Sequence, residues 1–290
     1  MLEEATGRKS MHEDKRRALE AQEKEIVALD PDHPGFRDLD YRARRNAIAK
    51  LAVEYREGDP VPFAEYTPEE HDVWRTVWGS LGPVHEKNAV REYLDASKAL
   101  DLSRDRIPQL SDVDQRVKAL SGFRMVPVAG LVTSRGFLSY LAKNVFLSTQ
   151  YIRHHSVPMY TPEPDIVHEL VGHAASLTHP AFVAMNQAFG RAAMRVDEET
   201  MIGLANVYWF TVEYGVVLED GVPKAYGAGL LSSFGELESF AETAELRRFD
   251  IEVIAKTGYD PTQYQKILFV GRDFESATRE ATAWADSLGY

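Results

Sequence analysis

Helical segments with clear start signals dominate this chain, and they constrain its fold more than any other feature. Residues 39–58, 67–82 and 85–100 each repeat apolar side chains at helical spacing. The second segment opens on Thr67 followed by Glu70, which is the pattern of a helix capping box. Gly or Pro follows most of these segments, as is typical of helix ends. We therefore predict a mainly α fold.

Strand signals are few and short. The clearest are residues 122–133 and residues 218–227, where an Asp-Gly pair indicates a small hairpin. The beginning of the chain is highly charged with few apolar positions, so we predict a charged N-terminal arm over residues 1–31. Residues 32–290 show no repeat and no linker, and they are predicted to form one domain with a minor sheet.

The composition limits the classes of function. A net charge of −12 and a pI near 5.3 argue against a general binder of nucleic acid or anionic membranes, since an acidic surface attracts neither. The chain has no cysteine, so any metal must be held by histidine and carboxylate side chains. It has no apolar leader and no apolar run long enough to cross a bilayer. We expect a cytoplasmic protein with no nucleic-acid or membrane partner.

The segment PDIVHELVGH, residues 164–173, places two histidines five positions apart. Five residues of a regular α-helix turn the chain by roughly 500°, which would leave His168 and His173 about 140° apart. The two can face one metal ion only if the helix bulges or ends near Gly172, the residue that most easily leaves helical geometry. The segment alone does not separate a metal site from two unrelated histidines, one exposed and one in the core.

A third ligand would separate these alternatives, and the segment NVYWFTVEYGV offers Glu213. This residue lies beside an apolar stripe at helical spacing that runs from Val207 to Val217. A carboxylate in such surroundings is costly to desolvate unless a metal ion or an arginine such as Arg153 compensates it. Two histidines and one carboxylate on one side of an ion form the facial arrangement of non-haem Fe(II) oxygenases. A zinc hydrolase that uses Glu169 as its base remains the rival.

Five ordered blocks of sequence resemble the pterin-dependent aromatic amino acid hydroxylases, among which the chain is closest in size to the bacterial phenylalanine hydroxylases. The blocks are HPGFRDLDYRARR (33–45), GFRMVPVAGLVTSRGF (122–137), TQYIRHHSVPMYTPEPDIVHELVGH (149–173), VYWFTVEYGV (207–216) and KAYGAGLLSSFGEL (224–237). The resemblance runs from about Asp32 to the C-terminus, and the family's catalytic fold is mostly helical. It implies a catalytic hydroxylase domain over residues 32–290.

The resemblance implies a set of metal ligands and cofactors. It assigns His168, His173 and Glu213 as ligands of Fe(II), where tetrahydropterin and O₂ together hydroxylate the ring of a free aromatic amino acid. Glu169 belongs to the expected catalytic residues and would approach the pterin through water. The expected pterin contacts are Gly130, Leu131, Val132, Thr133, Phe137, Glu169 and Tyr208.

The resemblance also implies how the amino acid is held. Arg153 would clamp the substrate carboxylate, because a planar guanidinium offers two parallel hydrogen bonds; its residue type alone would favour a salt bridge to Asp165. Ser232 is also placed to hydrogen-bond a ligand histidine. Asp165 is expected to orient a histidine, and Glu163 to pair with Arg45. The expected substrate contacts are Arg153, Thr161, Pro164, Trp209, Tyr214, Gly229 and Ser232.

Departures from the family pattern bear on the substrate. Tyr214 stands where phenylalanine is usual, Gly136 replaces an acid, and Pro261 falls where the phenylalanine and tyrosine hydroxylases differ. Trp209 favours phenylalanine or tyrosine over tryptophan. We predict conversion of L-phenylalanine to L-tyrosine; another aromatic amino acid, meta hydroxylation, a zinc hydrolase and a non-catalytic binding protein stay as alternatives. The sequence shows neither the family's regulatory domain nor its C-terminal heptad helix, so we expect a monomer.

Overall fold

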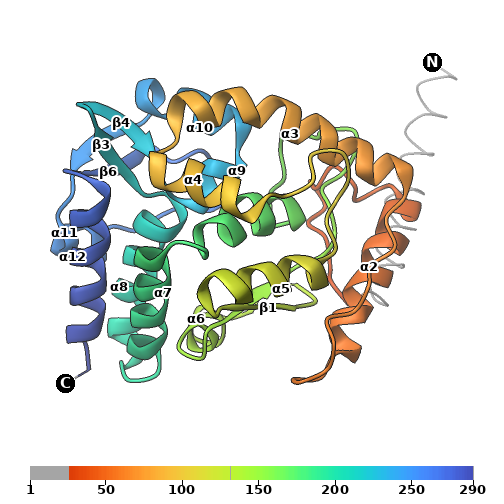
Figure 1. The fold of residues 1–290 in the computed structure, drawn as a ribbon, viewed down its shortest axis with the longest axis horizontal. Helices are drawn as coiled ribbons and strands as arrows, with labels where there is room; N and C mark the ends of the chain where they lie inside the picture. Colours follow the sequence, from red (N-terminus) through yellow and green to blue (C-terminus); the bar gives the residue numbers. More distant parts are fainter. Residues whose placement is uncertain (1–25, 131, 290) are drawn as a thin grey trace, which may run out of the picture.

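Helices account for most of the described part of the chain, residues 26–130 and 132–289 of the computed structural model (Figure 1). The α-helices are α2 (Leu39–Glu54), α3 (Pro68–Asn88), α4 (Arg91–Leu100), α5 (Leu110–Ser121), α6 (Ser134–Leu141), α7 (Pro180–Ala193), α8 (Glu198–Tyr208), α9 (Ala228–Ser232), α10 (Phe234–Thr243), α11 (Ile251–Ala255) and α12 (Phe274–Ser287). Two π-helical segments are η1 (His168–Ala174) and η2 (Trp209–Glu213). The predicted mainly α fold is confirmed, while most of the expected arm, residues 1–25, lies outside the described residues.

The strands of the described residues are short and form a pair and a four-stranded sheet. They are β1 (Arg124–Pro127), β2 (Val145–Ser148), β3 (Val216–Glu219), β4 (Val222–Ala225), β5 (Glu245–Arg248) and β6 (Ile267–Gly271). The larger sheet has the order β4-β3-β6-β5, with β3 and β4 antiparallel and the other pairs parallel. Asp220 and Gly221 join β3 to β4 with positive φ of 52° and 80°, so the predicted Asp-Gly hairpin is confirmed.

Local start signals work as the sequence indicates in α3. The Thr67 hydroxyl accepts from the Glu70 backbone N–H at 3.2 Å, and the Glu70 carboxylate accepts from the Thr67 backbone N–H at 2.7 Å. The helix predicted over residues 85–100 is wrong in one respect, because Ala89 and Val90 are extended and separate α3 from α4. The Val90 N–H instead donates to the carbonyl of Ala225, the last residue of β4, at 3.0 Å. A tertiary hydrogen bond therefore overrides the local helical pattern.

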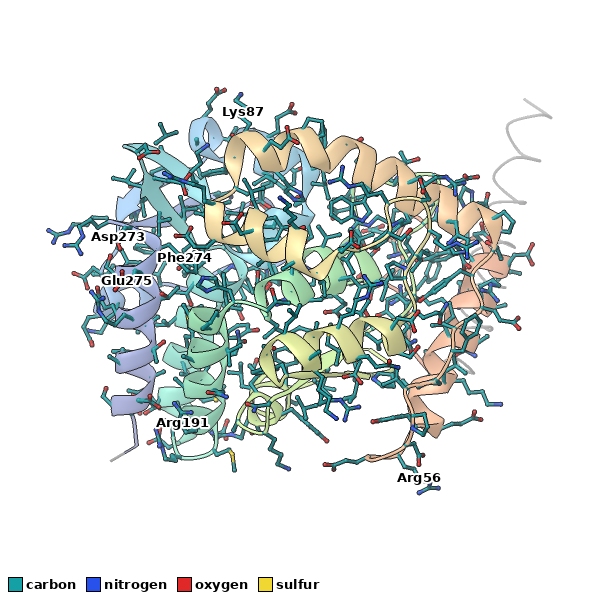
Figure 2. All side chains as sticks on the ribbon, viewed as in Figure 1. Arg56, Lys87, Arg191, Asp273, Phe274 and Glu275 are labelled. Atoms are coloured by element: carbon teal, nitrogen blue, oxygen red, sulfur yellow. The ribbon has the colours of Figure 1, made fainter. Side chains whose placement is uncertain are left out.

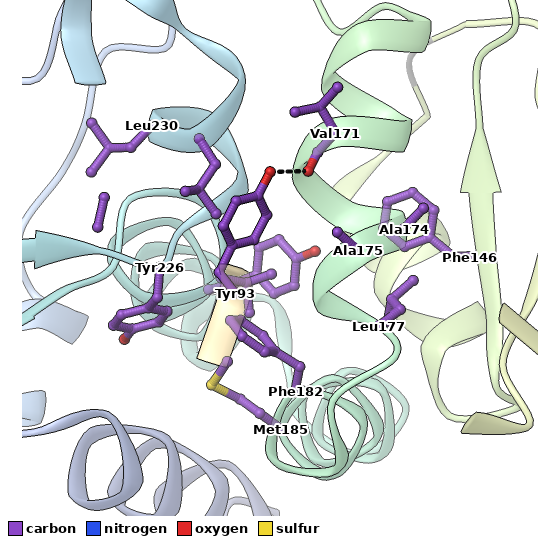
Figure 3. Packing of buried hydrophobic residues seen from close by; sticks show 14 of the residues in the cluster. Tyr93, Phe146, Val171, Ala174, Ala175, Leu177, Phe182, Met185, Tyr226 and Leu230 are labelled. Atoms are coloured by element: carbon purple, nitrogen blue, oxygen red, sulfur yellow. Dashed lines mark hydrogen bonds between the residues drawn. The ribbon is translucent and has the colours of Figure 1, made fainter. Parts of the chain in front are cut away.

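The core lies around η1. Figure 3 shows Tyr93 of α4 donating its hydroxyl to the Val171 carbonyl of η1, at 2.9 Å. Tyr93 is fully buried, and aromatic and aliphatic side chains such as Phe146 and Phe182 pack around the same segment. The helix α7, which carries Phe182, packs in turn against α6, α8 and α12. The segment that carries both motif histidines is thus held on several sides.

Many charged side chains lie on the outside of this helical assembly. Arg56, Lys87 and Arg191 are exposed at the surface (Figure 2). Among the described helices, none combines the length and the apolar character that crossing a bilayer requires. This agrees with the hydropathy of the sequence.

Candidate active site

A cavity of about 540 Å³ gathers segments that are distant in the sequence. Its walls come from the loop after β1, residues 153–164, η1, η2, α9 and residues 259–264. The expected site residues that line it are Gly130, Val132, Phe137, Arg153, Thr161, Pro164, His168, Glu169, His173, Tyr208, Trp209, Glu213, Tyr214, Gly229 and Ser232. Thr133 is not among the lining residues, and Leu131 lies outside the described residues.

The π-helix η1 explains the spacing of the two histidines. A π-helix closes hydrogen bonds between residues five apart, so side chains at that spacing lie above one another. The rings of His168 and His173 accordingly meet edge to face, with centroids 4.7 Å apart. Gly172 packs so tightly that a Cβ atom there would lie 2.7 Å from the Ala228 carbonyl oxygen of α9. The predicted bulge is confirmed, and it turns both imidazoles to one side.

The second π-helical segment, η2, brings the carboxylate to the same point. Its hydrogen bond from the Tyr214 N–H to the Trp209 carbonyl spans five residues at 2.8 Å and places Glu213 toward the histidines. The Nε2 atoms of His168 and His173 are 3.0 Å apart. Glu213 Oε1 lies 3.1 Å from His173 Nε2, and Glu213 Oε2 lies 3.5 Å from His168 Nε2. Three ligand side chains therefore converge from two elements.

These separations fit a metal ion. Ligand bonds of about 2.1 Å put neighbouring donors about 3.0 Å apart at right angles and about 3.4 Å apart at tetrahedral angles. The three measured separations, 3.0, 3.1 and 3.5 Å, fall near these values. Two imidazoles and one carboxylate on one face leave further coordination positions open, as in non-haem Fe(II) sites.

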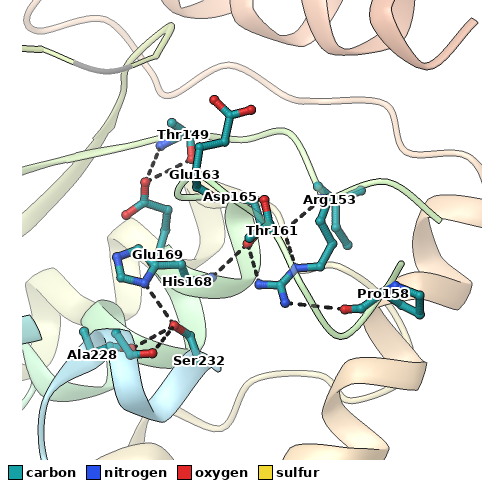
Figure 4. Close-up of polar contacts among 12 residues, drawn as sticks. Thr149, Arg153, Pro158, Thr161, Glu163, Asp165, His168, Glu169, Ala228 and Ser232 are labelled. Carbon is teal, nitrogen blue, oxygen red and sulfur yellow. Dashed lines mark hydrogen bonds and ion pairs between the residues drawn. The ribbon is translucent and has the colours of Figure 1, made fainter. Parts of the chain in front are cut away.

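A hydrogen bond to His168 Nδ1, on the side of the ring away from Glu213, determines which ring nitrogen can bind a metal (Figure 4). The Ser232 hydroxyl donates to the Ala228 carbonyl at 2.8 Å, so its oxygen accepts from His168 Nδ1–H at 2.9 Å. With the proton on Nδ1, the Nε2 lone pair is free to bind a metal. The expected contact of Ser232 with a ligand histidine is present.

Burial and mutual charge set the protonation of this group. Burial, with His173 beside it, lowers the pKa of His168 to about 4, which keeps its ring neutral. Burial opposes the charge on both His173 and Glu213, but their mutual attraction outweighs it, raising the pKa of His173 and lowering that of Glu213. Glu213 is therefore ionised at neutral pH, as a metal ligand must be.

A second group of possible metal donors lies outside the cavity and is arranged differently. Asp38, His154 and His155 offer one ligand atom each, all within 4.8 Å of one another. The Ser156 backbone N–H donates to His154 Nδ1 at 3.2 Å, so this nitrogen carries no proton. His154 Nε2–H then donates to Asp38 Oδ2 at 3.2 Å. With Nδ1 accepting and Nε2 donating, His154 has no lone pair left for an ion, so we assign this group a structural role.

Arg153 is paired rather than free. Its Nε and one terminal nitrogen donate to the two oxygens of Asp165, both at 2.8 Å, and both side chains are almost fully buried (Figure 4). Asp165 also accepts from the His168 backbone N–H at 3.2 Å, so it orients the start of η1 rather than an imidazole. The remaining guanidinium nitrogen makes only a long contact, 3.4 Å, to the Pro158 carbonyl. Arg153 therefore keeps a donor for the cavity that it lines.

The expected pterin side of the cavity is aromatic with one buried acid. Phe137 packs edge-on to Tyr208 with ring centroids 6.1 Å apart. Glu169 accepts from both the backbone N–H and the hydroxyl of Thr149, at 3.1 and 2.9 Å, and burial raises its pKa to about 7. The Thr133 hydroxyl caps α6 by accepting from the Gly136 N–H. The expected pterin side of the cavity therefore offers aromatic rings for packing and the Glu169 carboxylate for hydrogen bonding.

The expected substrate side contains aromatic residues that the motifs did not single out. Trp209 stacks on Tyr259 at 4.1 Å with an interplanar angle of 6°, and it packs against Tyr214 at 4.7 Å. Tyr264 and Glu236 also line the cavity. The only sequence signal for the 259–264 wall was its departure from the family pattern at Pro261. The expected ion pair of Glu163 with Arg45 is present at 2.8 Å.

Comparison with known proteins identifies close relatives. A phenylalanine-4-hydroxylase from Caenorhabditis elegans is 45% identical over 265 residues, which cover 90% of this chain and 58% of the relative. A tyrosine 3-monooxygenase from Bos taurus is 44% identical over 265 residues, with 90% of this chain and 54% of the relative covered. The chain thus spans less than two thirds of the length of these curated relatives.

Solved structures of bacterial phenylalanine hydroxylases are also similar to this chain. Chromobacterium violaceum phenylalanine hydroxylase with bound iron(III) and 7,8-dihydrobiopterin superposes with a TM-score of 0.74 at 27% identity, covering 82% of this chain and 90% of that one. The apo phenylalanine hydroxylase of Colwellia psychrerythraea gives a TM-score of 0.70 at 29% identity, with 78% and 91% covered. Residues 13–289 match the family model described as biopterin-dependent aromatic amino acid hydroxylase. The chain belongs to this biopterin-dependent aromatic amino acid hydroxylase family.

Proposed function

We propose that the chain is an Fe(II)- and tetrahydropterin-dependent monooxygenase that converts L-phenylalanine to L-tyrosine. The observation that carries this proposal is the convergence of His168, His173 and Glu213 on one point, with the Nε2 lone pair of His168 directed there. Family membership and the iron- and pterin-bound relative support the cofactors. When bound, iron and reduced pterin would supply the activation of O₂.

The residues of the chain would position and protect the reactants. Arg153 would hold the substrate carboxylate with its remaining donor while Asp165 fixes the guanidinium plane. Trp209 and Pro164 line the cavity and would hold the ring in place. Phe137 would contact the pterin by its ring face, which orients the cofactor before reaction.

Glu169 would act on the pterin rather than as the base of a hydrolase. Its carboxylate already accepts two hydrogen bonds from Thr149, on the side of the cavity assigned to the cofactor. With a pKa near 7, raised by burial, it can hold a proton or release it to a neighbouring water at neutral pH. We therefore propose a proton-handling role for Glu169 next to the pterin.

Ring 3-hydroxylation of tyrosine is a second candidate, because the curated relatives named tyrosine 3-monooxygenase are nearly as similar as the phenylalanine hydroxylase. The Tyr214 hydroxyl adds a polar group to the cavity and could favour a phenolic ring. Both solved structures compared above are phenylalanine hydroxylases, and this favours phenylalanine as the substrate. The expected monomer remains a prediction.

One experiment tests the proposal. Purified, iron-loaded protein is incubated with tetrahydropterin, O₂ and each of phenylalanine, tyrosine and tryptophan, and the products are identified by mass and retention time. We expect para-tyrosine from phenylalanine, with no product when iron or pterin is left out. A catechol from tyrosine as the main product would favour the second candidate. Tyrosine formed without pterin would contradict the proposed cofactor use.

A further inference from the structure

The carboxylates that line the cavity differ in whether a cation or a donor already compensates them. Glu163 pairs with Arg45 at 2.8 Å, and Glu213 pairs with His173 at 3.1 Å in the position of a metal ligand. Glu169 receives both hydrogen bonds of Thr149. These three acids are therefore engaged.

Glu236 has the fewest described partners of the four carboxylates. Among the described residues its one hydrogen bond comes from the Gln265 backbone N–H, which donates to Oε1 at 2.6 Å, and no described lysine, arginine or histidine pairs with it. Its other oxygen, Oε2, has no donor from the described protein residues, although Glu236 lines the cavity. The residue is only 4% exposed, and burial raises the pKa of its carboxyl group to about 7. A buried carboxylate without a cation is costly unless a ligand supplies one.

The surroundings of Glu236 belong to the substrate side. It stands in the first turn of α10, which follows α9 and its last residue Ser232 after the extended Ser233, and its charge acts on the hydroxyls of Tyr214 and Tyr264. A free amino acid carries a carboxylate and an ammonium, and burying either charge requires an opposite partner. Arg153 lines the same cavity and offers a partner for the carboxylate, while the ammonium still needs an acceptor.

We infer that Glu236 accepts the α-ammonium group of the amino-acid substrate through Oε2 and thereby makes the cavity selective for free amino acids. This inference rests on the proposed hydroxylase function. The hydrogen bond from Gln265 holds the carboxylate in place, and Gln265 Oε1 accepts from Trp209 Nε1 at 3.0 Å, so the ammonium site and the ring wall are joined by one residue.

The test compares two ligands that differ only in the ammonium group. Binding of L-phenylalanine and of 3-phenylpropanoate to the iron-loaded protein is measured by calorimetry at about pH 8, where Glu236 is ionised. The variant Glu236→Gln keeps an oxygen that can accept from the Gln265 N–H but removes the charge. Glu238→Gln, on the exposed face of the same helix, is the matched control.

We expect Glu236→Gln to weaken L-phenylalanine binding about ten- to a hundredfold, the effect of one charge-assisted hydrogen bond, and to leave 3-phenylpropanoate within about twofold. Glu238→Gln should change neither. Equal weakening of both ligands, or unchanged L-phenylalanine binding, would overturn the inference, because a purely structural role does not distinguish the ligands. If Glu236→Gln fails to fold, the wild-type protein decides: it should prefer L-phenylalanine at least about tenfold, and equal affinities would contradict the inference.

These outcomes are separable from a failure of the proposed function. Wild-type protein that binds L-phenylalanine through Glu236 but hydroxylates no aromatic amino acid would contradict the hydroxylase and keep the ammonium site. Wild-type protein that makes tyrosine while Glu236→Gln weakens both ligands equally would keep the hydroxylase and remove the ammonium site. Wild-type protein that binds no aromatic amino acid would contradict both.

Discussion

The two groups of metal-type donors among the described residues have similar compositions and opposite chemistry. His168, His173 and Glu213 form one group, and Asp38 with His154 and His155 forms the other. In the first, the Ser232 hydroxyl accepts a hydrogen bond from His168 Nδ1–H, so the lone pair of His168 Nε2 is free to bind a metal. In the second, a backbone N–H donates to Nδ1 of His154, so Nε2 carries the proton and donates to Asp38. The partner on the far side of an imidazole therefore decides whether its near side can bind a metal.

Burial separates the two groups as well. The side chain of Glu213 is 12% exposed and lines the cavity, whereas the His155 side chain is 41% exposed. A water-excluded site strengthens every electrostatic interaction inside it, while an exposed group is screened. The first group is built to hold a charged ion, and the second ties the N-terminus of α2 to residues 154–156.

The largest effect should come from removing the carboxylate of each group in turn. Glu213→Ala removes a ligand, so we expect iron affinity and hydroxylation to fall together, by roughly a hundredfold or more. Asp38→Ala removes only a hydrogen-bond acceptor, so iron content should stay at the wild-type value. Metal analysis and product formation measure both. Full turnover in Glu213→Ala would show that the ligand assignment is wrong.

Arg153→Ala should have the next largest effect, and it acts on folding as well as on substrate. Removing the guanidinium leaves the fully buried Asp165 without its cation, which costs about 3–5 kcal/mol of unfolding free energy. We expect this loss in denaturant titration, together with weaker L-phenylalanine binding.

The double variant Arg153→Ala, Asp165→Asn is the control for that prediction. It removes the unpaired charge and should recover part of the stability without recovering substrate affinity. If Arg153→Ala unfolded at the wild-type denaturant concentration, the ion pair would contribute nothing measurable, and Arg153 would act on the substrate alone.

Much of the metal group could be predicted from sequence because its information is local. The five-residue spacing of His168 and His173 demands a bulge wherever the two meet, and the π-helix supplies it. The stripe from Val207 to Val217 was predicted less well, since the helix ends in η2 and Val217 belongs to β3. A period count cannot foresee that the chain leaves the helix at Tyr214, where φ is −126°.

The second group and Glu236 could not be predicted, because their partners are remote in the chain. Asp38 and His154 are 116 residues apart, and Glu236 meets Gln265 across 29 residues. Only the fold brings such pairs together. Likewise, the resemblance placed Arg153 in the site, but the strength of its pairing with Asp165 follows from burial that no sequence motif encodes.

A hydrogen bond from His85 holds α9, the helix that carries Ser232 beside the metal ligands, and it predicts a pH dependence of stability. His85 Nε2 donates to the Leu231 carbonyl at 2.6 Å, next to Ser232, and burial lowers the pKa of His85 to about 4. Unfolded protein binds this proton with a pKa near 6.5, so the folded state binds fewer protons between the two values. Stability from His85 is therefore complete above pH 6.5 and is lost as pH falls toward 4.

A comparison with His85→Gln measures that contribution. The glutamine amide can still donate to Leu231 but does not titrate. From pH 7 to pH 4 we expect wild type to lose up to about 3 kcal/mol more unfolding free energy than the variant. Groups common to both proteins cancel in the difference. Parallel pH profiles would show that His85 is not neutral and buried as its contacts indicate.

The smallest effect, and the one that tests the comparison most directly, concerns the serine beside each group. Ser232→Ala removes the acceptor that holds the Nδ1 proton of His168, and loss of such a contact lowers metal affinity about 10- to 100-fold. Ser156→Ala removes the hydroxyl near His154 Nδ1 but keeps the backbone N–H, so iron affinity should not change and stability should fall by about 1 kcal/mol. Iron titration and thermal unfolding of both variants decide the matter. Unchanged iron affinity in Ser232→Ala would mean that the two π-helical segments alone orient the ligands, and that the partner on the far nitrogen does not distinguish the two groups.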